Sequence, residues 1–372
     1  MHIGIPQEAR AGEARVAATP ETVKKYVTQG HQVIVQSGAG TRASQPDAAY
    51  EAVGATIGTA ADALGAQLVL KVRAPTDAEL TLIKPGTVLV GMLNPFDAEI
   101  KARMDEAGVI AFALEAAPRT TRAQSMDVLS SQANIAGYKA VLVAAQHYQR
   151  FMPMLMTAAG TVKAARMLIL GAGVAGLQAI ATAKRLGAVI EASDVRPAVK
   201  EQIESLGAKF LDVPFVTDEE REIAQGVGGY ARPMPVDWMR RQAELVHERA
   251  KAADIVITTA LIPGRQAPVL LKEETVQAMK PGSVVVDLAA AQGGNCPLTV
   301  ADAVVEQHGV TLIGHTNLAS MVAADASALY ARNVFDFLKL VIDKEGQFTL
   351  NLDDDIVAAC LMTKRAEMAL EQ

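Results

Sequence analysis

The sequence Met167-Leu-Ile-Leu-Gly-Ala-Gly-Val-Ala-Gly-Leu177 decides the fold of this chain. Its first four residues are apolar and predict a buried parallel strand. The glycines that follow have the spacing G-x-G-x-x-G. Gly171 permits a tight turn, Gly173 lets a pyrophosphate approach the backbone, and Gly176 allows the helix to pack closely on the strand. An apolar-striped helix from Leu177 to Leu186 presents its N-terminus to phosphate. The stretch therefore predicts a dinucleotide site, in preference to a purely structural turn.

A second strand, Val189 to Ser193, ends at Asp194, about 20 residues after the glycines, where such sites carry the acid that binds ribose. A carboxylate accepts from a 2′-hydroxyl and repels a 2′-phosphate, so Asp194 favours NAD over NADP. Arg196 could hold such a phosphate, but we expect it to pack over the adenine or to face solvent. The cofactor-binding residues predicted for this half of the site are Gly171, Gly173, Val174, Ala175, Gly176, Asp194, Val195 and Arg196.

Composition predicts a large α/β protein. The 372 residues suffice for about two domains. Half of them are hydrophobic, yet no apolar run approaches the ~18 residues that span a bilayer. The N-terminus lacks the form of a signal peptide, and two cysteines do not suggest a disulfide framework, so we expect a cytoplasmic protein without direct membrane insertion. A net charge of −6 without a long basic run argues against nucleic acid. The six histidines are dispersed and predict no metal site.

Strand and helix patterns alternate through the first 113 residues. Thr19 and Pro20 have the residue types of a helix N-cap and a first helical position. Gly38-Ala-Gly40 resembles a second glycine-rich turn, but it lacks the third glycine and the acid, so we interpret it as structural. We expect strands at His2–Ile5, His31–Gln36, Ala52–Ile57, Leu68–Val72, Thr87–Met92 and Val109–Ala113, and a helix at Asp97–Ala107. This alternation predicts a doubly wound domain.

Polar residues 118–134 interrupt the alternation, and residues 216–235 are long and glycine-rich enough to predict a mobile flap. Helices are expected at Ile135–Arg150, Pro197–Leu206, Val236–Ala253, Ser327–Leu340 and Asp354–Glu371, and strands at Lys209–Val213, Ile255–Thr258, Ser283–Leu288 and Thr311–Gly314. We predict two doubly wound, Rossmann-like domains with mostly parallel sheets. Residues 135–319 form the NAD-binding domain. Residues 1–134 form the other, which is discontinuous and is completed by the helices of residues 320–372.

Over nearly its full length, the sequence resembles the family of alanine dehydrogenases and nicotinamide nucleotide transhydrogenases. Residues 4–20 resemble the opening that both branches share, whereas residues 118–138 resemble the transhydrogenase loop known by its Arg, Gln and Asp. Further segments that resemble the transhydrogenase branch are Met156–Gly160, Thr258–Gly264, Gly293–Pro297 and Gly314–Asn317. The resemblance implies catalytic roles for Arg119, Gln124 and Asp127, and cofactor contacts from Ser130, Thr259, Ala260, Leu261 and a flap tyrosine, Tyr230.

The two branches differ in chemistry. Oxidative deamination needs a general acid/base beside the reacting carbon. By resemblance, alanine dehydrogenases carry a histidine where this sequence has Asn94 and an aspartate where it has Ala291. Direct hydride transfer between two nicotinamides needs positioning and the exclusion of water instead. Arg15 and Lys71, the carboxylate-binding pair of the family, remain here, and we interpret them as relics that hold the interdomain cleft together.

Three functions stay open at this point. The resemblance favours an NAD(H)-binding component of a proton-translocating transhydrogenase, with NADP(H) bound by a partner subunit, a separate membrane-spanning subunit, and a homodimer that associates peripherally with the inner membrane. The second is an alanine-dehydrogenase-like enzyme, and the third is a non-catalytic NAD-binding module. The chain has one complete dinucleotide fingerprint, so it needs a partner for NADP.

Overall fold

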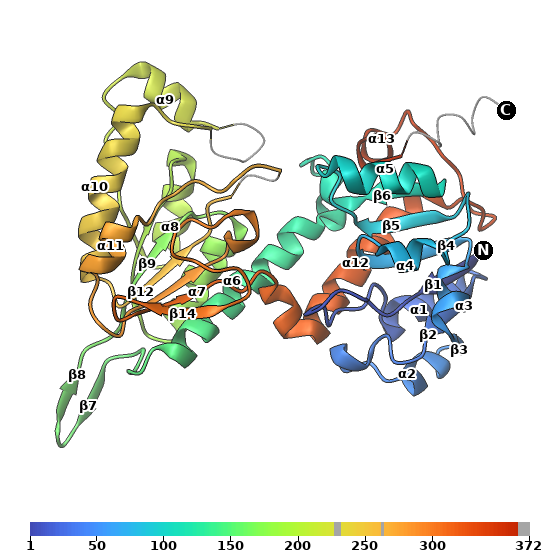
Figure 1. The fold of residues 1–372 in the computed structure, drawn as a ribbon, viewed down its shortest axis with the longest axis horizontal. Coiled ribbons are helices and arrows are strands. Elements are labelled where there is room, and N and C mark those ends of the chain that lie inside the picture. The colour runs from blue at the N-terminus through green and yellow to red at the C-terminus, as the bar shows by residue number, and fades with distance from the viewer. Residues whose placement is uncertain (227–231, 262–263, 364–372) are drawn as a thin grey trace. The chain divides into compact units, whose positions relative to one another are not determined.

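The computed structural model describes residues 1–226, 232–261 and 264–363 and divides into two compact units (Figure 1). Unit 1 combines Met1–Gln132 with Ala319–Gln372, and unit 2 is Ala133–Leu318. Each unit contains a mostly parallel sheet with helices packed around it. The predicted α/β class with two Rossmann-like folds, the first one discontinuous, is confirmed.

The sheet of unit 1 has six parallel strands in the order β3-β2-β1-β4-β5-β6. The order reverses between β1 and β4, which places a topological switch point at their carboxyl ends. The strands are β1 (His2–Ile5), β2 (Gln32–Gln36), β3 (Thr56–Gly58), β4 (Leu68–Arg73), β5 (Val88–Met92) and β6 (Ile110–Ala113). The helices are α1 (Pro20–Thr28), α2 (Asp47–Glu51), α3 (Ala60–Leu64), α4 (Asp77–Leu80), α5 (Ala98–Ala107), α12 (Ala323–Val341) and α13 (Asp355–Cys360).

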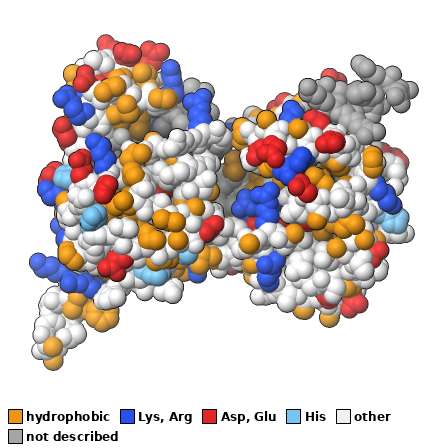
Figure 2. Space-filling model, in the orientation of Figure 1, with side chains coloured by type: hydrophobic (Ala, Val, Ile, Leu, Met, Phe, Trp, Pro, Cys, Tyr) orange, Lys and Arg blue, Asp and Glu red, His pale blue; other side chains and the backbone are white. Residues whose placement is uncertain are grey.

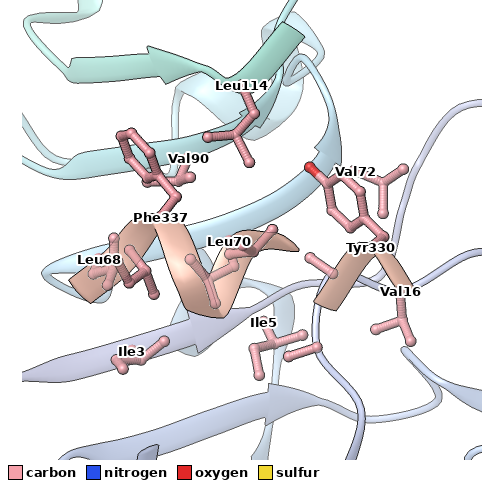
Figure 3. Close-up of a cluster of buried hydrophobic side chains, with 14 of the residues drawn as sticks. Ile3, Ile5, Val16, Leu68, Leu70, Val72, Val90, Leu114, Tyr330 and Phe337 are labelled. Atoms are coloured by element: carbon pink, nitrogen blue, oxygen red, sulfur yellow. The ribbon is translucent and has the colours of Figure 1, made fainter. Parts of the chain in front are cut away.

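Helix α12, from the C-terminal part of the chain, completes the core of unit 1. Tyr330 and Phe337 point from α12 into a cluster with Leu68 and Leu70 of β4 and Val90 of β5 (Figure 3). Both aromatic side chains are fully buried, and each such burial contributes about 1.5–3 kcal/mol. The Tyr330 hydroxyl also donates to the carbonyl oxygen of Lys71 at 2.7 Å. The N-terminal sheet therefore depends on a helix that follows it only after the whole of unit 2.

The sheet of unit 2 has the order β11-β10-β9-β12-β13-β15-β14, parallel except for the edge strand β14. Its switch point lies between β9 and β12. The strands are β9 (Arg166–Leu170), β10 (Val189–Ser193), β11 (Lys209–Phe210), β12 (Ile255–Thr258), β13 (Val284–Asp287), β14 (Val304–Gln307) and β15 (Val310–Ile313). The helices are α7 (Val174–Arg185), α8 (Lys200–Ser205), α9 (Asp218–Ala224), α10 (Val236–Ala252) and α11 (Glu273–Ala278).

Two expected strands are shorter in the structure. The expected strand Ala52–Ile57 begins as a turn, because α2 ends at Glu51 and Gly54 adopts φ +95° before β3 starts. The expected strand Lys209–Val213 pairs with β10 only over Lys209 and Phe210. Beyond Phe210 the chain leaves the sheet, since Leu211 and Val213 pack into other apolar clusters.

Two expected helices have different limits. Helix α6 runs Val128–His147 and starts seven residues before the expected Ile135. The expected helix Asp354–Glu371 is helical over Asp355–Cys360, after which Leu361 turns to an extended conformation and pairs with Phe112 of β6. The remainder of that expected helix lies largely outside the described residues.

A hairpin of β7 (Leu155–Thr157) and β8 (Gly160–Val162) projects from unit 2, and no sequence signal predicted it (Figure 1). Its two strands form a sheet of their own. Among the described residues, no helix has both the length and the apolarity to cross a bilayer.

Candidate functional site

The glycine-rich turn of unit 2 has the geometry that its sequence predicted. Gly171 has φ +99°, and a Cβ there would lie 2.5 Å from Thr259 Oγ1. A Cβ on Gly176 would lie 1.9 Å from the carbonyl oxygen of Gly171. A Cβ on Gly173, in contrast, would have no protein atom within 4 Å. Two glycines are therefore required by packing within the protein, whereas Gly173 keeps open the space outside the turn.

Gly173 is the N-cap residue of α7, so the N–H groups of Val174, Ala175 and Gly176 belong to the first turn and lack partners within the helix. All three residues are partly or fully covered by protein, and the open side is that of Gly173. Gly137 of α6 supports this turn, because a Cβ there would lie 2.1 Å from the carbonyl oxygen of Ala175. A glycine inside a helix gave no sign of this role in the sequence.

Asp194 and Arg196 form an ion pair at the end of β10. Asp194 accepts four hydrogen bonds: from the backbone N–H of Ala172 (2.8 Å), the backbone N–H of Arg196 (2.8 Å), and Nε and Nη2 of Arg196 (2.9 Å each). The Asp194 side chain is 7% exposed and that of Arg196 is 17% exposed. Hydrogen bonding to Asp194 raises the pKa of Arg196. The expectation that Arg196 packs over adenine or faces solvent is wrong in this structure, because its guanidinium is directed at Asp194.

Thr259, Ala260 and Leu261 follow β12 on the other side of the switch point. The backbone N–H of Thr259 donates to Leu170 at 2.8 Å, and its hydroxyl donates to the carbonyl oxygen of Gly171 at 2.9 Å. The Asn295 side chain donates to the carbonyl oxygen of Ala260 at 2.7 Å. The structure thus brings these three residues together with the glycine-rich turn.

Asp287, the last residue of β13, is a buried residue of this site that the sequence did not reveal. It accepts from the hydroxyls of Thr258 and Thr299 and from the backbone N–H groups of Ala289, Asn295 and Cys296. These five bonds fix the loop that carries Ala291 and Asn295. A short apolar strand ending in Asp is the only signal that pointed to it.

A cavity of about 300 Å³ opens beside Asp194. Its lining includes Val195, Lys200, Phe215 and Trp238, with Phe215 and Trp238 stacked at a centroid separation of 6.2 Å. Trp238 is 1% exposed, and within the described part of the chain its Nε1 has no acceptor. The cavity is thus apolar on one wall and charged at its entrance.

The loop of unit 1 exposes two of its predicted catalytic side chains, Arg119 and Gln124. Asp127 directly precedes α6, and its carboxylate accepts from the backbone N–H (2.8 Å) and the hydroxyl (2.6 Å) of Ser130. Asp127 therefore has the contacts of a helix N-cap, and the predicted neighbours Asp127 and Ser130 lie together. Tyr230, the predicted flap residue, lies outside the described residues.

The same loop is tied to the C-terminal segment of unit 1. Arg122 makes a bidentate pair with Asp354, at 2.6 and 2.7 Å, and also contacts Asp355. Asp354 is the N-cap of α13, as the sequence predicted, and Arg122 lowers its pKa to about 2. The backbone of the loop is thus held from outside while Arg119 and Gln124 stay exposed.

Charged residues are buried at the switch point of unit 1. Arg15 pairs with Glu13 at 2.7 Å, and Lys71 pairs with Glu79 at 2.6 Å and with Glu8 at 3.3 Å. Each of these side chains is at most 10% exposed. Burial raises the pKa of Glu8, although Lys71 and the backbone N–H of Val72 oppose the shift. Arg15 and Lys71 therefore act inside unit 1, which is a more specific role than the expected hold on an interdomain cleft.

The two positions that distinguish the branches have neutral side chains in ordered loops. Asn94 follows β5 with φ +57°, and its backbone N–H donates to Glu115 at 2.6 Å. Burial raises the pKa of Glu115. Ala291 lies in the 3₁₀ turn Ala290–Gln292 that Asp287 stabilises. The turn Gly38-Ala-Gly40 is structural as expected, because Asp47 accepts from the N–H of Gly38 at 2.9 Å.

Comparison with known proteins agrees with these features. The family model "Alanine dehydrogenase/PNT, N-terminal domain" matches residues 4–136, and "Alanine dehydrogenase/PNT, C-terminal domain" matches residues 140–371. The first of the two chains that make up NAD(P) transhydrogenase subunit alpha in Rhodospirillum rubrum is 51% identical over 373 aligned residues, covering 98% of this chain and 96% of that protein. Alanine dehydrogenase 1 of Staphylococcus aureus is 30% identical, covering 92% of this chain and 88% of its own. The crystal structure of transhydrogenase from Sinorhizobium meliloti superimposes with a TM-score of 0.88 at 48% identity, covering 98% of both chains.

Proposed function

This chain belongs to the alanine dehydrogenase/PNT family, and from that membership we propose that it is the NAD(H)-binding component of a proton-translocating transhydrogenase. NADH bound by this chain passes a hydride directly to NADP⁺ bound by a partner subunit. A separate membrane-spanning subunit couples this transfer to proton translocation. The chain associates with the cytoplasmic face of the inner membrane through these partners.

One observation carries the choice of reaction: positions 94 and 291 hold an amide and a methyl group, neither of which exchanges a proton near neutral pH. Amino-acid deamination requires that exchange, and hydride transfer between nicotinamides does not. Arg15 and Lys71 do not restore it, because Glu13, Glu79 and Glu8 already neutralise them. The 51% identity with a transhydrogenase subunit, against 30% with an alanine dehydrogenase, supports the same choice.

The proposed nucleotide site uses the open turn of unit 2. The pyrophosphate lies against Gly173, where a Cβ would meet no protein atom, and accepts from the N–H groups of Val174 and Ala175. Asp194 binds the adenosine ribose, and the cavity beside it takes the adenine, with Val195 in its wall. Since Arg196 fills much of the acceptor capacity of Asp194, its side chain must turn aside for the ribose hydroxyl. Further contacts are assigned to Gly171, Gly176, Thr259, Ala260, Leu261 and Tyr230.

The proposed catalytic residues are Arg119, Gln124 and Asp127, with Ser130 beside them. They hold the carboxamide, ribose and phosphates of the nicotinamide half, so that the reacting carbons meet in the productive geometry. Asp127 does this while it caps α6, which makes its position the most rigid of the three.

A homodimer belongs to the proposal, and the hairpin β7–β8 supports it. A two-stranded ribbon is marginally stable alone in water. Here it exposes Met156 (78%) and lies beside exposed Met154 (54%) and Phe151 (56%). Hydrophobic side chains are visible on and beside it in Figure 2. We expect Met156→Asp to shift the chain from dimer to monomer in sedimentation velocity, and a wild-type chain that sediments as a monomer would contradict the dimer.

The decisive experiment measures hydride transfer from NADH to an NADP⁺ analogue, with and without an NADP-binding partner subunit. We expect transfer only with the partner, and no reduction of pyruvate plus ammonia by NADH. Gln124→Asn and Arg119→Ala should slow single-turnover transfer far more than they weaken NADH binding. Activity on pyruvate and ammonia would instead establish an alanine-dehydrogenase-like enzyme. NADH binding without either reaction would leave a non-catalytic module.

A further inference from the structure

A continuous chain of hydrogen bonds links Arg15 to the backbone of the catalytic loop. Arg15 Nη1 donates to Gln132 Oε1 at 2.7 Å, and Gln132 Nε2 donates to Ser131 Oγ at 3.2 Å. The Ser131 hydroxyl donates to Asn333 Oδ1 at 2.7 Å, and Asn333 Nδ2 donates to the carbonyl oxygen of Ser125 at 2.7 Å. All five residues belong to unit 1.

The side chains that carry this chain are removed from solvent. Arg15 is 2% exposed, Gln132 7% and Asn333 9%. Hydrogen bonds in such surroundings are electrostatically stronger than in water, and a buried amide that loses its partner is costly. The network therefore favours one arrangement of the loop over others.

Asn333 holds the loop at the point where position matters most. Ser125 is the residue after Gln124 and lies in the 3₁₀ turn Gln124–Met126. The neighbouring side chains Ala123 and Met126 are buried in the core, at 1% and 6% exposure. Asn333 binds the intervening carbonyl, so the Gln124 side chain is presented outward on a backbone fixed from within.

We propose that Asn333 is a positioning residue for Arg119, Gln124 and Asp127, and that Arg15 stabilises it through Gln132 and Ser131. The role in catalysis rests on the proposed function, whereas the anchoring of the loop does not. The inference gives Arg15 a use in a protein without a substrate carboxylate: it fixes the far end of the network. A planar amide suits the position, because one end of it donates and the other accepts at the same time.

Asn333→Leu tests the proposal, because leucine has nearly the same size and neither donates nor accepts. In the complex with an NADP-binding partner, we expect single-turnover hydride transfer to slow by at least about tenfold, since displacements near 1 Å cost up to about 100-fold. The dissociation constant for NADH should stay within about twofold. Arg332→Ala is the matched control, because Arg332 is the preceding residue of α12 and pairs with Glu21 on the exposed side at 2.7 Å. It should leave the transfer rate unchanged.

Two further measurements separate positioning from general damage. In Gln124→Asn, the additional loss caused by Asn333→Leu should be much smaller than in the wild type, because both changes disturb one placement. In the chain alone, amide hydrogen exchange should accelerate over residues 119–130 and not over the strands of unit 1. If Asn333→Leu does not fold, Ser131→Ala, which removes one link, replaces it.

An unchanged transfer rate in a folded Asn333→Leu variant would overturn the proposal, as would equal acceleration of exchange throughout unit 1. Additive losses with Gln124→Asn would also count against it. If the wild-type complex transfers no hydride, the proposed function fails. The exchange experiment then still decides whether Asn333 anchors the loop.

Discussion

Exchanging Asp194 for asparagine should shift the nucleotide preference of unit 2 toward NADPH. In the wild-type structure the Asp194 carboxylate accepts from Nε and Nη2 of Arg196 at 2.9 Å each, so the guanidinium is neutralised. Asparagine keeps an acceptor for the ribose but removes the negative charge. The positive charge of Arg196 then acts on the place where a 2′-phosphate would lie, without an opposing carboxylate at position 194.

The size of the shift follows from the pair that is broken. A hydrogen bond to a charged group contributes about 1.5–3 kcal/mol. If Arg196 makes one such bond to the 2′-phosphate, the ratio of NADPH to NADH affinity rises roughly 10- to 150-fold, since each 1.4 kcal/mol is tenfold. The wild type should prefer NADH because its carboxylate repels the phosphate and accepts from the hydroxyl.

Isothermal titration with NADH and NADPH measures the ratio directly. The series consists of the wild type, Asp194→Asn, Arg196→Leu and the double variant, and the double variant should lose the gain in NADPH affinity. An Asp194→Asn protein with the wild-type ratio would refute the role of the ion pair. Equal affinities of the wild type for both nucleotides would refute the assignment of Asp194 to the ribose.

Three other predictions address the turn, the cavity and the loop anchor. Gly173→Ala should weaken NADH binding while stability changes by no more than about 1 kcal/mol, because its Cβ meets no protein atom, whereas Gly176→Ala should destabilise unit 2 in thermal denaturation. NADH should shift the fluorescence of Trp238, which lines the proposed adenine cavity; an unchanged spectrum at saturating NADH would argue against that assignment. Arg122 lowers the pKa of Asp354 to about 2, so the pair stabilises the fold above the unfolded pKa of Asp354 and this contribution is lost as pH falls through about 2. Arg122→Ala should therefore lower the melting temperature at pH 6 and lose this effect near pH 2, and a pH-independent difference would refute the pair.

The sequence predicted best what has a local cause. The unit β9–α7–β10 could be predicted because an apolar run, three spaced glycines and a terminal acid all lie between Met167 and Asp194. The start of α6 could not, since its first turn is polar and its N-cap, Asp127, looks like a loop residue. Asp194 could be identified as the terminal acid, but its pairing with Arg196 depends on side-chain conformation that spacing does not encode.

Residues whose partners are distant in sequence stayed hidden. Asn333 has the pattern of one polar residue in an amphipathic helix, and only the fold places it against Ser125 and Ser131, more than 200 residues earlier. Asp287 likewise looks like a strand end until its loop closes around it. The family resemblance supplied Arg119, Gln124 and Asp127 as candidates, but it did not supply what holds them.

The completion of unit 1 by α12 has a consequence for biosynthesis. The ribosome releases residues 1–132 first, but Tyr330 and Phe337, which cover their sheet, emerge only after all of unit 2. Unit 2 is contiguous and can fold while the apolar face around Leu68 and Leu70 is still open. At about 5–20 residues per second, the roughly 200 intervening residues take about 10–40 s to translate. During that interval the nascent chain exposes a surface that chaperones bind, so a ribosome stalled before α12 would carry a folded unit 2 and an aggregation-prone unit 1.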